Sequence, residues 1–202
     1  MVPTLGPAEH LCRSLDTMPI VCLDTNMIDP FVDLPAKYPD LLAHIEAVQP
    51  PPSYLCTDDA GVYWIMTLAP VWSSVLFTFT PRLYEELQAM PPIKRARASA
   101  LLGFAVELRE NNPEEYINVE ACPRPSVTHV QAWGLGHADA LHIVDAIGMG
   151  ASYFLTFDKQ LRRKAMEPAS AWRLRVSHPM GFIRDAYSHG APFPANVELE
   201  DL

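Results

Sequence analysis

The sequence predicts an α/β fold of three layers, in which a mostly parallel central sheet is covered by helices on both faces. Two observations predict this class. Short apolar runs alternate along the chain with amphipathic stretches, and such an order of strands and helices favours a parallel sheet. The 202 residues, of which 49% are hydrophobic and 19% charged, can bury one sizeable core. We therefore expect one domain without internal repeats.

The first predicted strand covers residues 19–23, with the sequence PIVCL, and it ends on Asp24. A helix is expected over residues 34–48, because the three prolines at residues 50–52 cannot continue a helix. Residues 50–60 should then form a surface loop.

The uncharged stretch at residues 61–80 is long enough to cross a bilayer, but a proline and two serines interrupt it. Its second half is rich in β-branched and aromatic residues. We therefore interpret it as a short helix around residues 63–69 and a buried strand at residues 74–79, rather than as a membrane span.

A helix is expected directly after this strand. Thr80 is a good N-cap, and Pro81 would occupy the first helical position, where its missing N–H costs nothing. This helix carries Glu86 and ends before the prolines at residues 91–92. A second amphipathic helix, basic at its start, is expected over residues 94–110.

The C-terminal half continues the alternation of helices and strands. Residues 111–133 are rich in proline and should be mainly loop, with room for a short helix. The next helix is bracketed by Gly136 and by Gly148 or Gly150. The remaining predicted elements are a strand at residues 152–157, a helix at residues 158–166, a strand at residues 172–179 and an extended tail after Tyr187.

Acidic residues stand where the strands end, at the edge where open α/β sheets bind ligands. Asp24 ends the first strand, Glu86 lies in the second turn of the helix after the second strand, and Asp158 follows a later strand. Asp139 begins a helix, where the helix dipole favours a carboxylate, and the helical repeat places it beside the apolar face. Asp145 lies about 120° away on that helix and is left out of the predicted site.

Charge and cysteine content restrict the partners. Four converging carboxylates would repel one another without a cation, and oxygen donors of this kind suit Mg²⁺ or Mn²⁺ rather than zinc. Because the formal net charge is −9, a polyanion would have to be held by local basic patches or by metal ions. The scattered cysteines, without a C-x-x-C pair, and the lack of signal-peptide features predict a reducing, cytoplasmic location.

Four stretches occur in the order found in one known family: VCLDTNMID, FTPRLYEEL, HADALHIVDAIGMGASYFLTFDKQL and LRVSHPMGFI. The third is the most specific of them. Over most of residues 18–185 the chain resembles the PIN-domain family of metal-dependent ribonucleases, which includes the VapC-type toxins of toxin–antitoxin pairs. The resemblance implies a three-layer, PIN-like fold and a site that holds Mg²⁺ or Mn²⁺. We accordingly divide the chain into a leader at residues 1–17, a PIN-like domain at residues 18–185 with an insertion at about residues 50–72, and a tail at residues 186–202.

The resemblance also implies roles for individual residues. The catalytic and metal-binding acids would be Asp24, Glu86, Asp139 and Asp158, with Glu85 as the fallback for Glu86. Their polar companions would be Thr25, Asn26 and Thr156. The nearby cations Lys159, Arg162 and Arg163 are candidates for binding the RNA backbone.

Each assignment has a plainer alternative. Asp24 can be a turn former, Asp139 a first-turn acid and Asp158 a simple N-cap. The basic run after Asp158 can be a solvated helix face. We interpret His137 and His142 as polar helix surface, since metal-bound water needs no histidine base.

These features predict an Mg²⁺- or Mn²⁺-dependent endoribonuclease that hydrolyses phosphodiester bonds of RNA, most simply of single strands. A homodimer is expected and, if the protein is a toxin, a protein antitoxin as partner. The alternative is a non-catalytic PIN-like module that binds RNA or protein. A doubly wound phosphatase with an aspartyl nucleophile would need a second acid where the chain has Asn26.

Overall fold

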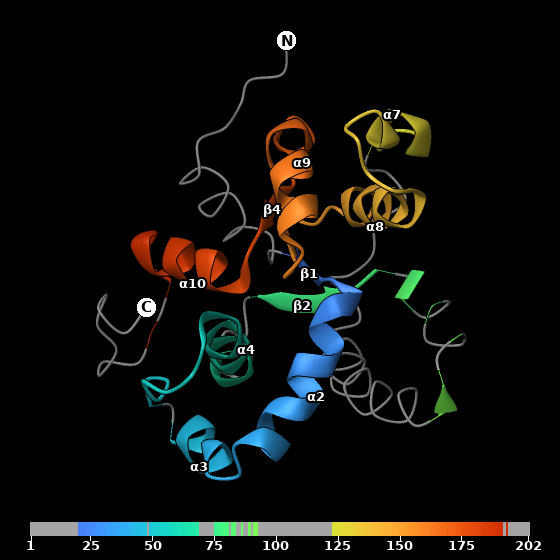
Figure 1. Cartoon of the computed structure of the whole chain (residues 1–202). Helices are drawn as coiled ribbons and strands as arrows, with labels where there is room; N and C mark the ends of the chain where they lie inside the picture. The colour runs from blue at the N-terminus through green and yellow to red at the C-terminus, as the bar shows by residue number, and fades with distance from the viewer. Residues whose placement is uncertain are drawn as a thin grey trace, which may run out of the picture.

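The computed structural model describes residues 20–47, 49–68, 75–80, 123–191 and 193, together with Arg82, Leu83, Glu86, Ala89, Pro91 and Pro92. In these residues the sheet has four strands, in the order β2-β1-β3-β4, and each neighbouring pair is parallel (Figure 1). The strands are β1 (Ile20–Leu23), β2 (Leu76–Phe79), β3 (Tyr153–Leu155) and β4 (Arg175–Ser177). The prediction of an α/β fold with a parallel sheet is confirmed.

Helices cover both faces of the sheet, so the fold has three layers (Figure 1). One outer layer contains α2 (Ile28–Lys37), α3 (Leu41–Glu46), α4 (Thr57–Leu68) and α10 (Pro179–Ser188). The other contains α7 (Val127–Gln131), α8 (His137–Gly148) and α9 (Lys159–Ser170). Successive side chains of a strand point to opposite faces. Val21 and Leu23 accordingly pack into the first layer and Cys22 into the second.

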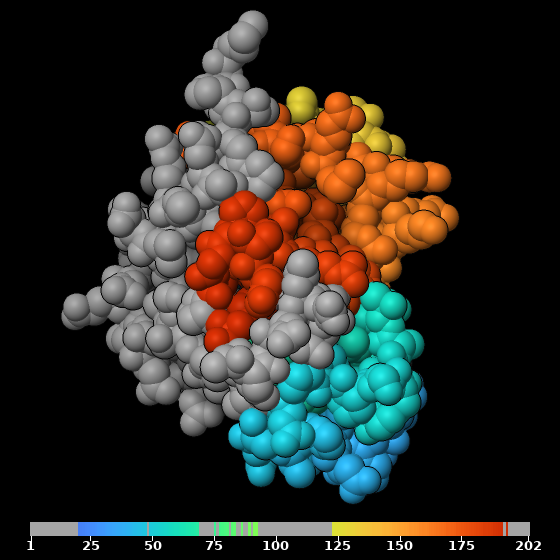
Figure 2. All heavy atoms as spheres, turned by 90° about the vertical axis from the view of Figure 1, so that its left-hand side faces the viewer, coloured from blue at the N-terminus to red at the C-terminus, as the bar shows by residue number. Residues whose placement is uncertain are grey.

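Helix α4 belongs to the core of the first layer, although its residues fall in the predicted insertion. Its Val62, Tyr63 and Trp64 side chains are fully buried. It packs against α10 so closely that a Cβ atom on Gly61 would come within 2.8 Å of the Cβ atom of Pro179. The side view in Figure 2 shows α10, in red, at the surface, with the teal residues of α4 next to it. Residues 57–68 are therefore part of the domain's packing.

The prediction of one helix over residues 34–48 is wrong. The chain instead forms α2 and α3, separated by a turn at Tyr38 and its neighbours. Tyr38 has φ −134° and ψ 82°, outside the helical region. A residue that precedes a proline is disfavoured in helical conformation, and Pro39 follows Tyr38, so the break has a local cause.

The C-terminal elements also differ in extent from the prediction. The predicted strand at residues 172–179 is shorter, because only Arg175–Ser177 pair with β3. Helix α10 was not predicted. It begins at Pro179, a favourable first helical residue, and its N-cap His178 accepts a hydrogen bond from the N–H of Met180 at 3.1 Å. It continues to Ser188, beyond the predicted domain end at residue 185.

The prediction of a surface loop over residues 50–60 is wrong in its last four residues, because α4 begins at Thr57, six residues before the predicted helix start. The other predicted elements agree in kind with the structure where it describes them, although their ends differ. The uncharged stretch at residues 61–80 forms the main part of α4 and all of β2, as the interpretation of a helix followed by a strand requires. Among the described helices, none has the length and apolar character needed to cross a bilayer. Helix α7 is the short helix allowed for within residues 111–133. The predicted leader at residues 1–17, the helix at residues 94–110 and most of the predicted tail lie outside the described residues.

Candidate functional site

Asp24 lies at the carboxyl end of β1, where the strand gives way to the 3₁₀ turn η1 (Thr25–Met27). Its N–H donates to the carbonyl of Leu155 at 2.9 Å, and its Oδ1 accepts a hydrogen bond from the N–H of Thr25 at 2.8 Å. The residue is only 8% exposed. Its carboxylate is thus fixed at the carboxyl edge of the two central strands.

Glu86 comes to the same edge from the helical segment after β2. This segment begins directly behind the strand, since the N–H of Leu83 donates to the carbonyl of Thr80 at 3.0 Å. The hydroxyl of Thr25 donates to Oε2 of Glu86 at 2.7 Å. Because Thr25 directly follows Asp24, this hydrogen bond holds Glu86 near Asp24, although the two acids are far apart in the sequence. The fallback residue, Glu85, lies outside the described residues.

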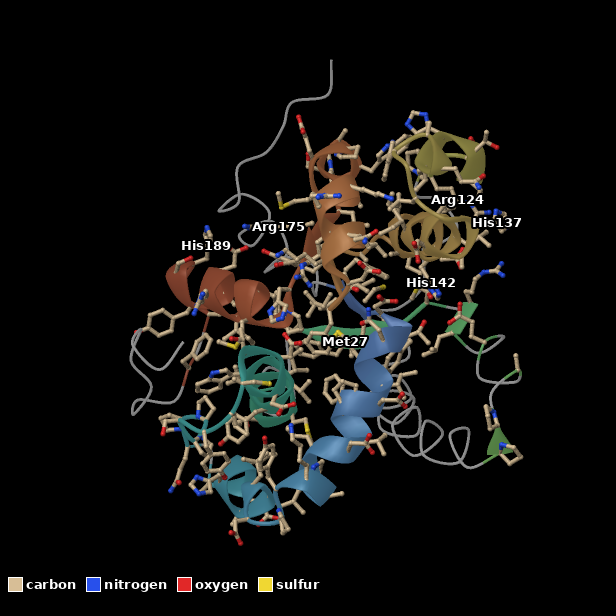
Figure 3. The ribbon with its side chains drawn as sticks, in the orientation of Figure 1. Met27, Arg124, His137, His142, Arg175 and His189 are labelled. Carbon is tan, nitrogen blue, oxygen red and sulfur yellow. The ribbon has the colours of Figure 1, made fainter. Side chains whose placement is uncertain are left out.

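His142 of α8 is a third group at this edge. Its Nε2 lies 2.8 Å from Oε1 of Glu86 and 3.4 Å from Oγ1 of Thr25, and its Nδ1 lies 2.7 Å from Oγ1 of Thr80. Figure 3 shows His142 on the side of α8 that faces the start of α2, and His137 at the outer side of the helix. The interpretation of His142 as polar surface is wrong. It is 5% exposed, whereas His137 is exposed.

Asp139 lies one helical turn before His142, in the first turn of α8, and is half-buried. Its Oδ2 would lie 3.5 Å from a Cβ atom on Gly136, the N-cap residue, so the carboxylate lies close to the positive end of the helix dipole. Its negative charge is near enough to raise the pKa of Asp24. The structure therefore brings Asp24, Glu86 and Asp139 to one edge of the sheet, and we call these three acids the carboxylate site.

Burial raises the pKa of Asp24 above its usual value, because a charged carboxylate loses its hydration inside the protein. The hydrogen bond from Thr156, the charge of His142 and the backbone hydrogen bond of Thr25 act in the opposite direction, and the charge of Asp139 raises the pKa further. The balance is upward. A cation bound beside Asp24 would compensate for both causes of the increase.

Thr156, at the end of β3, links the predicted polar companions. Its hydroxyl donates to Oδ2 of Asp24 at 2.5 Å and accepts a hydrogen bond from Nδ2 of Asn26 at 2.9 Å. Oδ1 of Asn26 in turn accepts from the N–H of Phe157 at 3.2 Å. Asn26 and Thr156 thus hold the ends of β1 and β3 together behind the Asp24 carboxylate.

Asp158 has the capping role that its sequence position allows. It is exposed, and its Oδ1 accepts hydrogen bonds from the N–H groups of Gln160 at 2.6 Å and Leu161 at 2.9 Å, at the start of α9. Its own N–H donates to Oγ1 of Thr156 at 3.0 Å. It is therefore joined to Asp24 through Thr156, while the carboxylate itself stabilises the helix.

The basic residues of α9 divide into two groups. Nη1 of Arg162 donates to the carbonyl of Thr156 at 2.6 Å, and Nζ of Lys164 donates to the carbonyl of Gly134 at 2.6 Å. These two cations hold the fold together. Lys159 and Arg163 are exposed on the same helix.

The donor chemistry of the carboxylate site fits Mg²⁺ or Mn²⁺, which prefer carboxylate oxygens. Each oxygen of Asp24 and Glu86 already accepts a hydrogen bond or lies within hydrogen-bonding distance of a partner, but a carboxylate has about four lone-pair sites, so it can still bind a cation. Among the described side chains no group of three or more His, Cys, Asp or Glu residues is spaced to hold a metal ion. Mg²⁺ does not require such a group, because waters and substrate phosphates commonly complete its shell.

Sequence reasoning left out His142 and Thr80, although both are part of the hydrogen-bonded edge. One signal for His142 was present. It lies three residues after Asp139, and residues with this spacing share a helix face, so a site that includes Asp139 extends naturally to His142.

Comparison with known proteins gives no family assignment. No family model matches the chain, and no solved structure matches it. Among curated proteins, the gamma-glutamyl phosphate reductase of Yersinia enterocolitica (serotype O:8 / biotype 1B) is 25% identical over 202 aligned positions, which cover 90% of the chain and 48% of that protein. The chain thus spans about half the length of this relative. A similarity of this extent does not establish membership of the reductase family. None of the comparisons tests the resemblance to PIN domains, which stays a prediction.

Proposed function

We propose that the protein is an endoribonuclease of the PIN-like type, which hydrolyses RNA phosphodiester bonds with the help of Mg²⁺ or Mn²⁺. The observation that carries this proposal is the position of Asp24, Glu86 and Asp139 at the carboxyl edge of a parallel sheet, where Thr25 links the first two and the charge of the third acts on Asp24. This edge is where open α/β folds bind ligands. Three acids so placed, with the pKa of one of them raised, are typical of a functional site.

In this proposal Asp24, Glu86 and Asp139 would hold the ion. Its chemistry there would be to acidify a water molecule and to offset negative charge on the phosphate. The chain supplies the rest. Thr25 and Thr156 fix the orientation of the two buried or half-buried acids through their hydroxyl groups, and such support from outside the ligand set is needed for an accurate site.

The exposed cations of α9 provide a place for the RNA backbone. Lys159 begins α9, three residues after Thr156, and Arg163 lies about one helical turn further along. Both are exposed and can contact phosphates electrostatically. Arg162 is held by the carbonyl of Thr156, so we assign it to positioning of the edge rather than to a free phosphate contact. A single-stranded or looped RNA in the cytoplasm is the proposed substrate. If the protein acts as a toxin, a protein antitoxin would cover the carboxylate site, and a homodimer is the proposed assembly.

A non-catalytic module that binds RNA or protein is the second candidate. One observation favours it: within the described parts of the chain, no three candidate ligands are already spaced for a metal ion. The two candidates predict different results when a divalent cation is added. A ribonuclease would cleave RNA, whereas a binding module would bind RNA and leave it intact.

The proposal is tested by incubating the purified protein with a 5′-labelled single-stranded RNA and MnCl₂. We expect internal cleavage that EDTA stops and that excess Mn²⁺ restores, because the ion supplies the activated water. Duplex RNA of the same sequence is the matched control and should be cleaved much more slowly. Cleavage that continues in EDTA, or Mn²⁺-dependent binding without cleavage, would contradict the ribonuclease proposal, and the second result would favour the binding module.

A further inference from the structure

We infer that His142 is a positioning residue that sets the affinity of the carboxylate site for a divalent cation, because it holds the carboxylate of Glu86 in register with Asp24. This inference rests on the proposed function of the site. Nothing in the resemblance to PIN domains or in the comparisons assigns His142 a role. Its contacts in the structure do.

The imidazole joins elements that are separate in the sequence. His142 lies in α8, Thr80 directly follows β2, and Glu86 lies in the helical segment beyond it. Nδ1 of His142 lies 2.7 Å from the Thr80 hydroxyl, and Nε2 lies 2.8 Å from Oε1 of Glu86. The ring therefore spans the distance between the end of β2 and the glutamate carboxylate.

Glu86 is the acid of the site that most needs such support. Its side chain is 32% exposed, whereas that of His142 is 6% exposed. A long side chain in water has many rotamers, and holding it in one of them costs conformational entropy at the moment when an ion binds. The hydroxyl of Thr25 fixes Oε2, and the buried imidazole fixes Oε1. Both carboxylate oxygens are thus held before any ion arrives.

The contact does not depend on the charge of the ring. A neutral imidazole with its proton on Nε2 donates to Glu86 and accepts from the Thr80 hydroxyl through Nδ1, and an imidazolium donates from both nitrogens. The hydrogen bond to Glu86 is present in either form. His142 acts through Glu86, so it is a positioning residue and not a catalytic one.

The rival explanation is purely structural, because a buried histidine with satisfied nitrogens also stabilises a fold. Two substitutions separate the roles. The side-chain amide of glutamine reaches about as far as imidazole Nε2, and that of asparagine about as far as Nδ1. His142→Gln can therefore keep the bond to Glu86, while His142→Asn can keep only the bond to Thr80.

The experiment is calorimetric titration of MnCl₂ into the full-length wild type and into His142→Gln, His142→Asn and His142→Ala, with thermal unfolding of each protein in EDTA. We expect His142→Gln to keep most of the wild-type Mn²⁺ affinity. His142→Asn and His142→Ala should lose about 10–100-fold, as is usual when the partner of a metal ligand is removed. Val144→Ala on the same helix is the matched control. It removes buried apolar atoms of the α7–α9 layer and should lower the unfolding temperature without changing the affinity.

The outcomes separate this inference from the proposed function. If the glutamine and asparagine variants both bind Mn²⁺ as the wild type does, His142 has no positioning role and the inference is overturned. If the wild type binds no Mn²⁺, the inference and the ribonuclease proposal both fall. If affinities follow the expected order but RNA stays intact, His142 has the inferred role and the ribonuclease proposal fails.

A second measurement covers the case in which the variants do not fold. In the wild type, the imidazole nitrogen signals of His142 are followed by NMR during titration with MgCl₂. The Nε2 signal should shift when the ion binds to Glu86, and the signals of the distant His189 should not. An unchanged Nε2 signal in a protein that binds Mg²⁺ would overturn the inference.

Discussion

The Asp24→Asn variant should lose about 10³-fold of the Mn²⁺-dependent cleavage of RNA, the upper range for removal of one electrostatic stabiliser, while it keeps the wild-type fold. Asn retains the size of the side chain and an oxygen that can accept the hydrogen bond from Thr25, but it lacks the negative charge that binds a cation. The measurement is the cleavage rate of a labelled RNA, with circular dichroism to confirm folding.

The same variant should differ from the wild type in the pH dependence of its stability. The folded-state pKa of Asp24 lies above the unfolded value of 3.8, so the folded protein holds this proton more tightly than the unfolded chain does. Ionisation of Asp24 therefore lowers the free energy of unfolding as the pH rises from 3.8 through the folded-state pKa, and no further change follows above it. Urea unfolding over this window should show the variant gaining stability relative to the wild type. Parallel curves for the two proteins, or an active variant, would contradict this account of Asp24.

The Asp139→Asn variant should lose about 10²-fold of the cleavage activity and should also lower the pKa of Asp24. The charge of Asp139 is one cause of the raised pKa, so its removal should move the pKa down, although burial, the larger cause, remains. Carboxyl ¹³C NMR titration of Asp24 measures the shift.

Asp145→Asn is the matched control for this prediction. Asp145 lies on the same helix, but its charge acts on Cys22, where burial and this neighbour raise the pKa of the thiol to about 12. The control should therefore change neither the cleavage rate nor the pKa of Asp24. If Asp139→Asn and Asp145→Asn changed the cleavage rate and the pKa of Asp24 equally, the cause would be the total charge of the helix. The position of Asp139 in the carboxylate site would then have no special role.

The parallel sheet and the acids at its edge could be predicted because both depend on local signals. Asp24 directly follows an apolar run, and Asp139 lies three residues after Gly136, in the first turn of a helix. In a parallel sheet the carboxyl ends of all strands lie at one edge, so recognising these strand ends was enough to place residues from distant parts of the sequence together. Glu86 could be placed for the same reason, because the segment that carries it follows the end of β2.

The parts that could not be predicted depend on packing between elements. The burial of His142 results from α8 lying against the segment after β2. Its spacing from Asp139 indicates which helix face it shares, but it does not show that this face is covered by another segment. Helix α10 depends likewise on its contact with α4, where Gly61 permits a close approach. The break between α2 and α3 is different, because the proline after Tyr38 was a readable signal.

Diffraction from crystals soaked in MnCl₂, with the anomalous signal of manganese, tests most directly whether Asp24, Glu86 and Asp139 form one ion-binding site. We expect a manganese peak bound by carboxylate oxygens of these residues, with the imidazole of His142 still bonded to Glu86. Two results would contradict the account. One is the absence of a manganese peak at this site, with the three carboxylates pointing away from one another, and the other is a manganese ion bound elsewhere on the protein.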